Sequence, residues 1–194
     1  MRIITGRYKG RHFDIPRTFK ARPTTDFAKE NIFNVLTQYV DFDGASALDL
    51  FSGTGSISLE LLSRGCEPVV SVELDRDHHR FIQQCLQKLG ACATTRQKGG
   101  EQDTRDAGKA GVIPIRGDVF RFLKTCHQQF DIIFADPPYA LKELPTIPDI
   151  IFEKDLLRPG GLFVFEHGKD HDFSEHPHFV EHRSYGSVNF SLFR

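Results

Sequence analysis

The sequence predicts an α/β fold built around a mainly parallel β-sheet. From residue 46 onward, short apolar runs alternate with amphipathic stretches, which is the pattern of repeated strand-helix-strand units. The last part of the chain alternates in polarity on both sides of Tyr185-Gly186, as an antiparallel hairpin at a sheet edge would. The 194 residues, 39% hydrophobic and 26% charged, suit one globular domain and exclude a multi-domain machine or a disordered chain.

Two short elements are expected before the sheet begins. Residues 1–16 alternate apolar positions with Arg and Lys and include two glycines, which predicts a small basic hairpin. Residues 26–36 carry apolar side chains at helical spacing behind the polar Thr25, which predicts a helix. We therefore divide the chain into a basic N-terminal hairpin and helix, residues 1–40, and a main domain, residues 41–194.

Seven strands and four further helices complete the expected architecture. Five parallel strands are expected at residues 47–51, 69–74, 112–116, 130–135 and 162–166. Helices are expected between them at residues 56–64, 76–89, 119–127 and 150–157. Two antiparallel strands are expected between Phe179 and Phe193. The polar, glycine-rich residues 93–111 have almost nothing to bury, which predicts a flexible surface loop.

The charge is unevenly distributed along the chain. The formal net charge is −1, yet residues 1–30 carry eight Lys and Arg against three Asp and Glu. Such a basic end is typical of a protein that contacts a polyanion such as RNA. The candidate RNA-binding residues are Arg7, Lys9, Arg11 and Arg22. The alternative is a solvated edge of the fold, whose charges keep it from pairing with other chains.

Cysteine and histidine spacing favours no metal site. The four cysteines, at positions 66, 85, 92 and 126, form no C-x-x-C pair and are interpreted as reduced thiols. Five histidines near the C-terminus fit no metal motif and are predicted to lie at the surface: His167, His171, His176, His178 and His182. No apolar run approaches the roughly 18 residues of a membrane span, and the first residues lack the apolar centre of a signal peptide. The predicted location is the cytoplasm, with no membrane partner.

A glycine-rich turn follows the first predicted strand. Small residues there let a ligand approach the backbone, and the following helix N-terminus offers unpaired N–H groups. Ser58 stands where a dinucleotide fingerprint has its third glycine, which argues against a nicotinamide cofactor, and a plain tight turn is the alternative. The candidate cofactor-binding residues of this segment are Asp49, Phe51, Ser52, Gly53, Thr54 and Gly55.

Acidic residues at the next two strand ends strengthen the case for a nucleoside-containing cofactor. Glu73, about 20 residues beyond the glycines, stands where a carboxylate can accept hydrogen bonds from ribose hydroxyls, with Leu74 beside it. Asp118, followed by Val119, comes after the third strand and could accept a hydrogen bond from an adenine amino group. For each acid alone, a solvated loop or a helix cap is the alternative.

The segment Asp136-Pro137-Pro138-Tyr139 is the candidate catalytic turn. It follows a buried strand directly, and its two prolines remove two N–H donors, so the turn presents carbonyl acceptors beside the Asp136 carboxylate. Acceptors that grip the hydrogens of an exocyclic amine favour its pyramidal, nucleophilic form. Tyr139 adds a ring on which a flipped or unpaired base can stack. A rigid strand-to-loop turn is the alternative.

These motifs resemble the class I S-adenosylmethionine-dependent methyltransferases that modify exocyclic amines. Over nearly the whole chain, the sequence is similar to RsmD-type 16S rRNA guanine N2-methyltransferases. The segments that carry this similarity are residues 2–11, 22–26, 49–55, 136–139 and 185–190. The resemblance implies a Rossmann-like fold, S-adenosylmethionine as methyl donor, no catalytic metal, and a guanine held by residues 136–139. It also implies that residues 1–40 contact RNA and cover the cofactor.

Two rival functions remain open at this point. The same acid-proline-proline-aromatic turn serves in DNA adenine and cytosine amino-methyltransferases, although 194 residues leave little room for a target-recognition domain. A non-catalytic RNA-binding assembly factor with a degenerate cofactor pocket is the other rival. The expected partner is 16S rRNA, free or in an assembling small ribosomal subunit, and the expected state is a monomer. The sequence does not indicate which nucleotide is modified.

Overall fold

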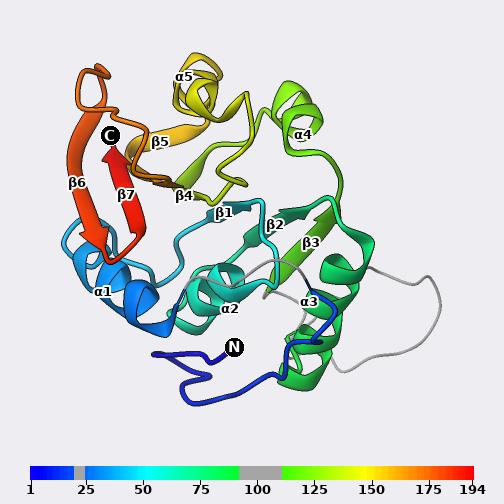
Figure 1. Cartoon of the computed structure of the whole chain (residues 1–194). Coiled ribbons are helices and arrows are strands. Elements are labelled where there is room, and N and C mark those ends of the chain that lie inside the picture. The colour runs from blue at the N-terminus through cyan, green and yellow to red at the C-terminus, as the bar shows by residue number, and fades with distance from the viewer. Residues whose placement is uncertain (20–24, 92–110) are drawn as a thin grey trace.

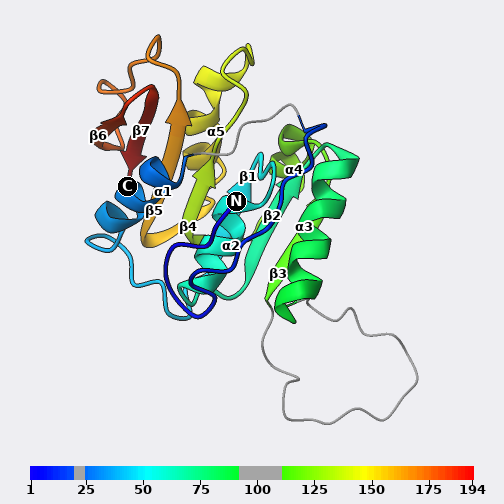
Figure 2. The same ribbon diagram turned by 60° about the horizontal axis from the view of Figure 1, so that its bottom comes forward.

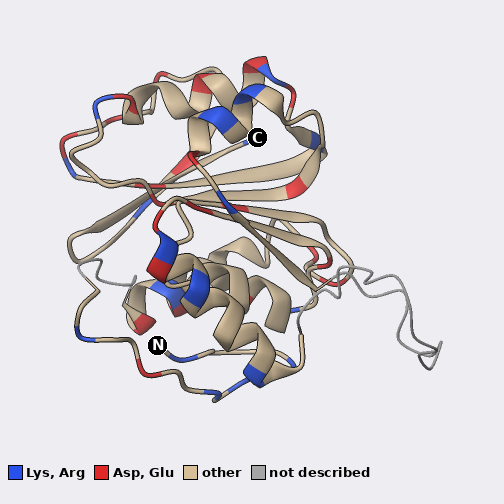
Figure 3. Ribbon diagram, turned by 90° about the vertical axis from the view of Figure 1, so that its right-hand side faces the viewer, with Lys and Arg blue, Asp and Glu red and all other residues tan. Residues whose placement is uncertain are grey.

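A single mixed β-sheet lies between two layers of helices. The computed structural model describes residues 1–19, 25–91 and 111–194. The predicted loop at 93–111 therefore falls outside the described residues except for Gly111, and so does Arg22. Figure 3 shows the sheet edge-on with helices above and below it. No helix in the described ranges is long and apolar enough to cross a membrane.

Seven strands form the sheet in the order β3-β2-β1-β4-β5-β7-β6 (Figure 1). They are β1 Ala47–Leu50, β2 Val69–Glu73, β3 Val112–Arg116, β4 Phe130–Ala135, β5 Leu157–His167, β6 Phe179–Tyr185 and β7 Val188–Phe193. The first five strands are parallel, β7 pairs antiparallel with β5, and β6 pairs antiparallel with β7. The predicted fold, a parallel core closed by an antiparallel hairpin, is confirmed.

The strand order places the carboxyl ends of five strands at one edge. The chain moves outward from β1 to β2 and β3, then returns to the other side of β1 as β4 and β5. Ligands of such open α/β sheets bind where the strand order reverses, outside the carboxyl ends of the strands. That position lies between β1 and β4. β3 is an edge strand, which explains why it tolerates Pro114.

The helices cover both faces of the sheet. They are α1 Asp26–Leu36, α2 Ser56–Ser63, α3 Arg76–Leu89, α4 Val119–Thr125, η1 Leu144–Thr146 and α5 Ile147–Glu153. The first three pack on one face together with Val164 of β5, and the last three pack on the other with Phe163 and Phe165. The period-two alternation of the strands thus gives each face its own apolar core.

The N-terminal segment packs on α2 rather than extending into solvent (Figure 2). The backbone N–H groups of Ile4 and Thr5 donate to the buried carboxylate of Glu60 on α2, at 2.8 and 3.1 Å. The predicted hairpin takes a reduced form, with one isolated antiparallel bridge between Arg2 and His12. Side-chain and backbone groups of α2 therefore accept hydrogen bonds from N–H groups of this segment, which a longer hairpin would pair between its own strands.

Lys29 of α1 is fully buried where the N-terminal segment meets α2. Its Nζ donates to the carbonyl of Arg2 at 2.6 Å and to Ser56 Oγ at 3.0 Å, and it lies 3.8 Å from Glu60 Oε2. Burial lowers the pKa of Lys29, which the charge of Glu60 partly opposes. The first turn of α1, the N-terminal segment and the start of α2 are thereby joined around one buried ammonium group.

Two predicted elements differ from the structure by three residues or more at one or both ends, and the others by at most two. The last predicted helix, 150–157, is wrong in register, since α5 covers residues 147–153. Pro145 and Pro148 occupy the first turns of η1 and α5, where a missing N–H costs nothing, so they start these helices instead of interrupting them. The strand predicted at 162–166 is longer because pairing with β4 begins at Leu157.

The prediction of surface histidines is wrong for His167. This residue is 1% exposed, with Nε2 2.8 Å from Ser191 Oγ and Nδ1 2.9 Å from the carbonyl oxygen of Gly168. It is the last residue of β5 and lies against the ring of Phe173. Burial lowers the pKa of His167. Across the described ranges, no group of three or more His, Cys, Asp or Glu side chains is placed to hold a metal ion.

Candidate active site

The glycine-rich turn after β1 has a strained left-handed backbone. Phe51, Gly53 and Gly55 have φ values of 60°, 53° and 76°, which residues other than glycine seldom adopt. Gly55 caps the N-terminus of α2 without any side-chain hydrogen bond. A side chain there would begin 2.8 Å from Ile82 Cγ1 of α3, so the close approach of the two helices also requires glycine. The N–H groups of Ser52, Gly53 and Gly55 donate within the protein, so the N–H groups left for a ligand are those of the first turn of α2.

Glu73, at the end of β2, holds this turn in place. Its Oε2 accepts a hydrogen bond from the N–H of Gly53 at 2.7 Å, and its Oε1 accepts one from the N–H of Asp75 at 2.7 Å. The residue is 8% exposed. The predicted ribose-binding carboxylate is therefore next to the glycine turn, and two backbone donors fix its orientation while each oxygen retains further acceptor capacity.

A buried polar layer lies beneath the turn. Asp49 of β1 is 1% exposed and accepts a hydrogen bond from the hydroxyl of Ser58 on α2. Burial raises the pKa of Asp49 to about 7, although the Ser58 hydrogen bonds oppose the shift. Ser52 Oγ donates to the carbonyls of Asp49 and Val72, at 2.8 and 3.1 Å. Asp49 and Ser52 thus support the glycine turn from below, and Thr54 Oγ1 lies 3.6 Å from Met1 Sδ at its side.

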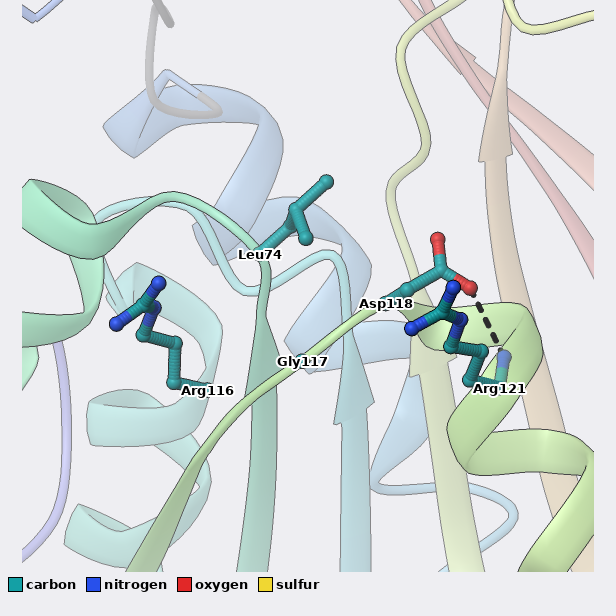
Figure 4. A pocket seen from close by; sticks show the side chains of 5 residues that line it. All are labelled: Leu74, Arg116, Gly117, Asp118 and Arg121. Atoms are coloured by element: carbon teal, nitrogen blue, oxygen red, sulfur yellow. Dashed lines mark hydrogen bonds between the residues drawn. The ribbon is translucent and has the colours of Figure 1, made fainter.

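A cavity of about 680 Å³ opens at the ends of β2 and β3 (Figure 4). Its lining consists of Leu74, Arg116, Gly117, Asp118 and Arg121. Asp118 caps α4 by accepting a hydrogen bond from the N–H of Arg121 at 2.9 Å. The cap was the alternative to the predicted ligand role, and the two do not exclude each other because Asp118 also lines the cavity. Leu74 is 64% exposed, which makes it available to a flat ligand. The side chain of Val119, in contrast, packs in the core, and only its first-turn N–H can face a ligand.

The predicted catalytic turn begins beside the glycine turn, across the boundary between β4 and β1. The N–H of Asp136 donates to the carbonyl of Leu50 at 3.3 Å. The expectation that both proline carbonyls point outward is wrong for Pro138, whose carbonyl accepts a hydrogen bond from the N–H of Leu141 at 2.9 Å as the chain turns back. Asp136 and the Pro137 carbonyl remain the candidate acceptors for an amine.

Tyr139 presents an accessible ring at this edge. The residue is 44% exposed, and its ring lies against Gly168, where an added Cβ would stand 3.4 Å from Tyr139 Cδ2. Its hydroxyl donates to Glu166 Oε1 at 2.9 Å. The ring is therefore anchored at its hydroxyl end while much of its surface is open, as a stacking platform for a base requires.

Glu166 is a site residue that the sequence reasoning missed. It is 4% exposed, on β5, and next to Asp136. Burial, followed by the charges of Glu166 and Asp49, raises the pKa of Asp136 well above its usual range. An acidic residue near the end of a buried strand was the available signal. Its partner, however, depends on which strand lies beside it, and this is not a local property.

Two of the predicted RNA-binding residues, Arg7 and Arg11, lie away from this edge. Arg7 pairs with Glu67, which precedes β2, at 3.3 Å, and Arg11 Nη2 donates to the carbonyl of Lys88 near the end of α3 at 2.9 Å. Glu67 and Lys88 both lie at the amino-terminal edge of the sheet. A five-residue strand such as β2 separates this edge from the carboxyl edge by about 16 Å. The structure therefore brings the predicted cofactor and catalytic residues together and places Arg7 and Arg11 elsewhere.

Comparisons with known proteins agree with this arrangement. A family described as conserved hypothetical protein 95 matches residues 1–194. The ribosomal RNA small subunit methyltransferase D of Escherichia coli is 32% identical over 86% of this chain and 74% of its own length. A structure of a hypothetical protein from Thermus thermophilus superposes with a TM-score of 0.78 and 25% identity, covering 100% of this chain and 99% of that one.

A more distant structural neighbour shows the shared fold. The 16S rRNA N2 G1207 methyltransferase of Thermus thermophilus, in complex with AdoMet and guanosine, has a TM-score of 0.64 and 20% identity. The alignment covers 91% of this chain and 44% of that one. The ribosomal RNA small subunit methyltransferase D of Escherichia coli is thus a relative of this chain. The family match over residues 1–194 shows that the chain belongs to the conserved hypothetical protein 95 family.

Proposed function

We propose that this protein transfers a methyl group from S-adenosylmethionine to the exocyclic N2 amine of a guanine in 16S rRNA. The observation that carries the proposal is the placement of the Asp136 turn directly beside the glycine turn, at the point where the strand order reverses. A methyl donor and an amine must lie side by side for direct transfer, and this edge offers adjacent places for both.

The described residues fit S-adenosylmethionine. The uncapped N-terminus of α2 offers N–H groups to a carboxylate, Glu73 suits ribose hydroxyls, and the cavity beside Asp118 suits a flat base. When bound, S-adenosylmethionine supplies an electrophilic methyl group on a positively charged sulfur. Asp49 and Ser52, which support the turn, would keep the carboxylate-binding backbone in place.

The residues of the catalytic turn would act on the amine. The Asp136 carboxylate and the Pro137 carbonyl would accept its two N–H hydrogens, which favours the pyramidal form with a localised lone pair. The open face of Tyr139 would hold the base in position by stacking. The new bond between the nitrogen and the methyl carbon would replace the carbon–sulfur bond of S-adenosylmethionine, which leaves S-adenosylhomocysteine. The excess proton of the nitrogen would then pass to a carboxylate oxygen of Asp136. Positioning and acceptor electrostatics would provide most of the rate.

Two comparisons support guanine in 16S rRNA as the target. The Escherichia coli relative is named for the small subunit RNA, and the Thermus thermophilus neighbour of the same fold holds AdoMet and guanosine. RNA contact is assigned to Arg7, Lys9, Arg11 and Arg22, the last outside the described residues. Residues 1–40 would extend the RNA surface from the catalytic edge along α2.

Nucleoside mass spectrometry tests the reaction. Purified protein is incubated with methyl-labelled S-adenosylmethionine and either 16S rRNA or small-subunit particles from cells that lack the protein, and double-stranded DNA serves as the control substrate. We expect N2-methylguanosine from the ribosomal substrate and no label in DNA. Label on an adenine or cytosine amine in DNA would favour the DNA enzyme. Failure to bind S-adenosylmethionine in calorimetry would favour the non-catalytic assembly factor.

Salt dependence tests the RNA surface. Log affinity for RNA should fall with log salt by about 0.7 to 0.9 per phosphate contact, so changing Arg7, Lys9 and Arg11 to Ala should flatten the slope by roughly two to three units. A control variant that replaces the exposed Lys124, Lys154 and Arg183 should keep the slope. Unchanged affinity and slope in the first variant would place the RNA surface elsewhere and support the edge-protection alternative.

A further inference from the structure

We propose that Arg116 and Arg121 hold backbone phosphates of the RNA at the carboxyl edge of the sheet, beside the nucleoside end of the cofactor site. This inference rests on the proposed function, since it names a further contact between the same site and its RNA substrate. It gives the RNA an anchoring point separate from Arg7 and Arg11, whose partners lie at the amino-terminal edge.

The position of the catalytic turn creates the need for such an anchor. A guanine held by Asp136 and Tyr139 brings its own ribose and phosphates to the carboxyl edge. The partners of Arg7 and Arg11 lie at the opposite edge, about 16 Å away for a five-residue strand such as β2. Phosphate contacts fix the register of a nucleic acid on a protein, so cations at the carboxyl edge are better placed to orient the target base.

Two arginines flank the cavity at this edge (Figure 4). Arg116 is the last residue of β3, and Arg121 lies in the first turn of α4, on the other side of Gly117. Both residues are exposed. Within the described parts of the chain, neither guanidinium group makes an ion pair or a hydrogen bond. Two such groups, each with its donors in a fixed fork, suit the oxygens of a phosphate.

Two acids close to these arginines serve as helix caps. Asp118, which lines the same cavity, accepts a hydrogen bond from the backbone N–H of Arg121 at 2.9 Å. Asp75 accepts hydrogen bonds from two backbone N–H groups in the first turn of α3, at 2.8 and 2.9 Å. These hydrogen bonds lower the pKa of Asp75, and the charge of Arg116 contributes to the shift. In the described residues neither acid forms an ion pair with Arg116 or Arg121, so the donors of both guanidinium groups stay available.

S-adenosylmethionine leaves both guanidinium groups without an anionic partner. Its nucleoside end carries no phosphate, and its carboxylate is assigned to the first turn of α2. The cavity of about 680 Å³ is in the size range of sites for whole drug-sized ligands, so an adenine base beside Asp118 fills only part of it. An RNA phosphate supplies the anionic oxygens that the arginines lack in the complex with the cofactor alone.

The distance along the edge suits a single strand of RNA. β2 and β1 lie between β3 and β4, so the ends of β3 and β4 are about 14 Å apart, at three strand spacings. A short run of unpaired nucleotides spans this distance while the target base stacks on Tyr139. The RNA would therefore run across the carboxyl ends of the strands, from β4 over the cofactor site to β3.

Replacing both arginines by alanine tests the contact. Because a single strand contributes a slope of about 0.7 per phosphate contact, Arg116→Ala with Arg121→Ala should flatten the plot of log affinity for 16S rRNA against log salt by about 1.4 units. At a fixed salt concentration, the affinity for 16S rRNA should fall by about tenfold or more. Calorimetry should show nearly unchanged affinity for S-adenosylmethionine.

Two further double variants serve as controls. Arg80→Ala with Lys124→Ala removes two exposed cations from α3 and α4 that do not line the cavity, and it should keep the slope. This control separates a local contact from a change in net charge. Arg116→Lys with Arg121→Lys keeps both charges and should restore the slope, while the affinity recovers only in part because lysine lacks the guanidinium fork.

The binding assay needs no methyl transfer, so its outcome is independent of the proposed reaction. An unchanged slope and unchanged RNA affinity in the double Ala variant would overturn the inference even if 16S rRNA is methylated. Weaker binding of S-adenosylmethionine with an unchanged RNA slope would assign the arginines to the cofactor and would overturn it as well. Conversely, a flattened slope in a protein that methylates no guanine would leave the phosphate contact standing while the proposed function fails.

Discussion

The two sides of the carboxyl edge use their acidic residues in opposite ways. On the β2 side, both oxygens of Glu73 accept hydrogen bonds from backbone N–H groups of the glycine turn and of Asp75. On the β4 side, Asp136 faces Glu166 and Asp49, which are acids like itself. Among the described residues, the first carboxylate accepts hydrogen bonds from two donors, whereas the charged groups that raise the pKa of the second are acids.

This difference separates a binding group from a reacting group. Backbone donors are fixed by the fold and cannot take up a proton, so Glu73 is suited to hold a neutral ligand at constant geometry. Burial and acidic neighbours raise the pKa of Asp136, so this residue is suited to take up a proton from an amine. The comparison predicts that changes on the β2 side alter affinity and changes on the β4 side alter rate.

The largest expected effect comes from Asp136→Ala. Because Asp136 would be the acceptor for the amine, methyl transfer should fall by about 10² to 10³-fold or more, as for loss of one oxyanion-hole group. Calorimetry should show nearly unchanged affinity for S-adenosylmethionine. Asp136→Asn is the matched variant, since it keeps an acceptor oxygen but cannot take up a proton, and it should retain part of the rate. A fully active Ala variant would remove Asp136 from the mechanism.

The next effect is expected on the β2 side. Glu73→Ala removes the carboxylate that faces the ribose position, so affinity for S-adenosylmethionine should weaken by about 1 to 3 kcal/mol. The rate at saturating S-adenosylmethionine should change much less. Asp77→Ala, which changes an exposed acid in the first turn of α3, is the control and should have no such effect. Unaltered affinity in Glu73→Ala would move the ribose to another residue.

A smaller effect concerns the backbone that the β2 side depends on. Gly55→Ala places a Cβ 2.8 Å from Ile82 Cγ1 at a φ of 76°, which should cost about 1 to 2 kcal/mol of stability. Gly117→Ala is the control, because nothing lies within 4 Å of its added Cβ and its φ is not positive. Thermal unfolding should show a lower Tm for the first variant by a few degrees. Equal Tm values would mean that the glycine turn relaxes freely.

The most gradual effect is a dependence of stability on pH that Asp49 introduces between the two sides. Burial raises its pKa to about 7 in the folded protein, against 3.8 for the ordinary side chain. Between these values the folded state holds a proton that the unfolded chain has lost, so this contribution falls as the pH rises, by about 1 kcal/mol per pH unit. Urea unfolding of Asp49→Asn, compared with wild type from pH 4 to 7, should lack this slope. Parallel curves would show that Asp49 ionises at its ordinary pKa.

Local signals account for much of what the sequence predicted correctly. The glycine turn, the cap at Thr25 and the apolar runs of the parallel strands depend on neighbours a few residues apart, and the structure has them where expected. The prediction places the last helix at residues 150–157, beyond both prolines, whereas α5 begins at Ile147 because the first turn of a helix accepts proline. Each of these features follows from backbone geometry within one element.

The sequence by itself determined the α/β fold, the acids at the strand ends and the acid-proline-proline-aromatic turn. Only the tertiary structure decided which acids meet. Glu166 stands beside Asp136 because β5 pairs with β4, and His167 is buried because β7 and Phe173 close over it. Strand order and register are set by contacts between residues far apart in the chain, and a single sequence records those contacts only indirectly. For this reason the donor-rich side of the edge was foreseeable, whereas the acid pair opposite it was not.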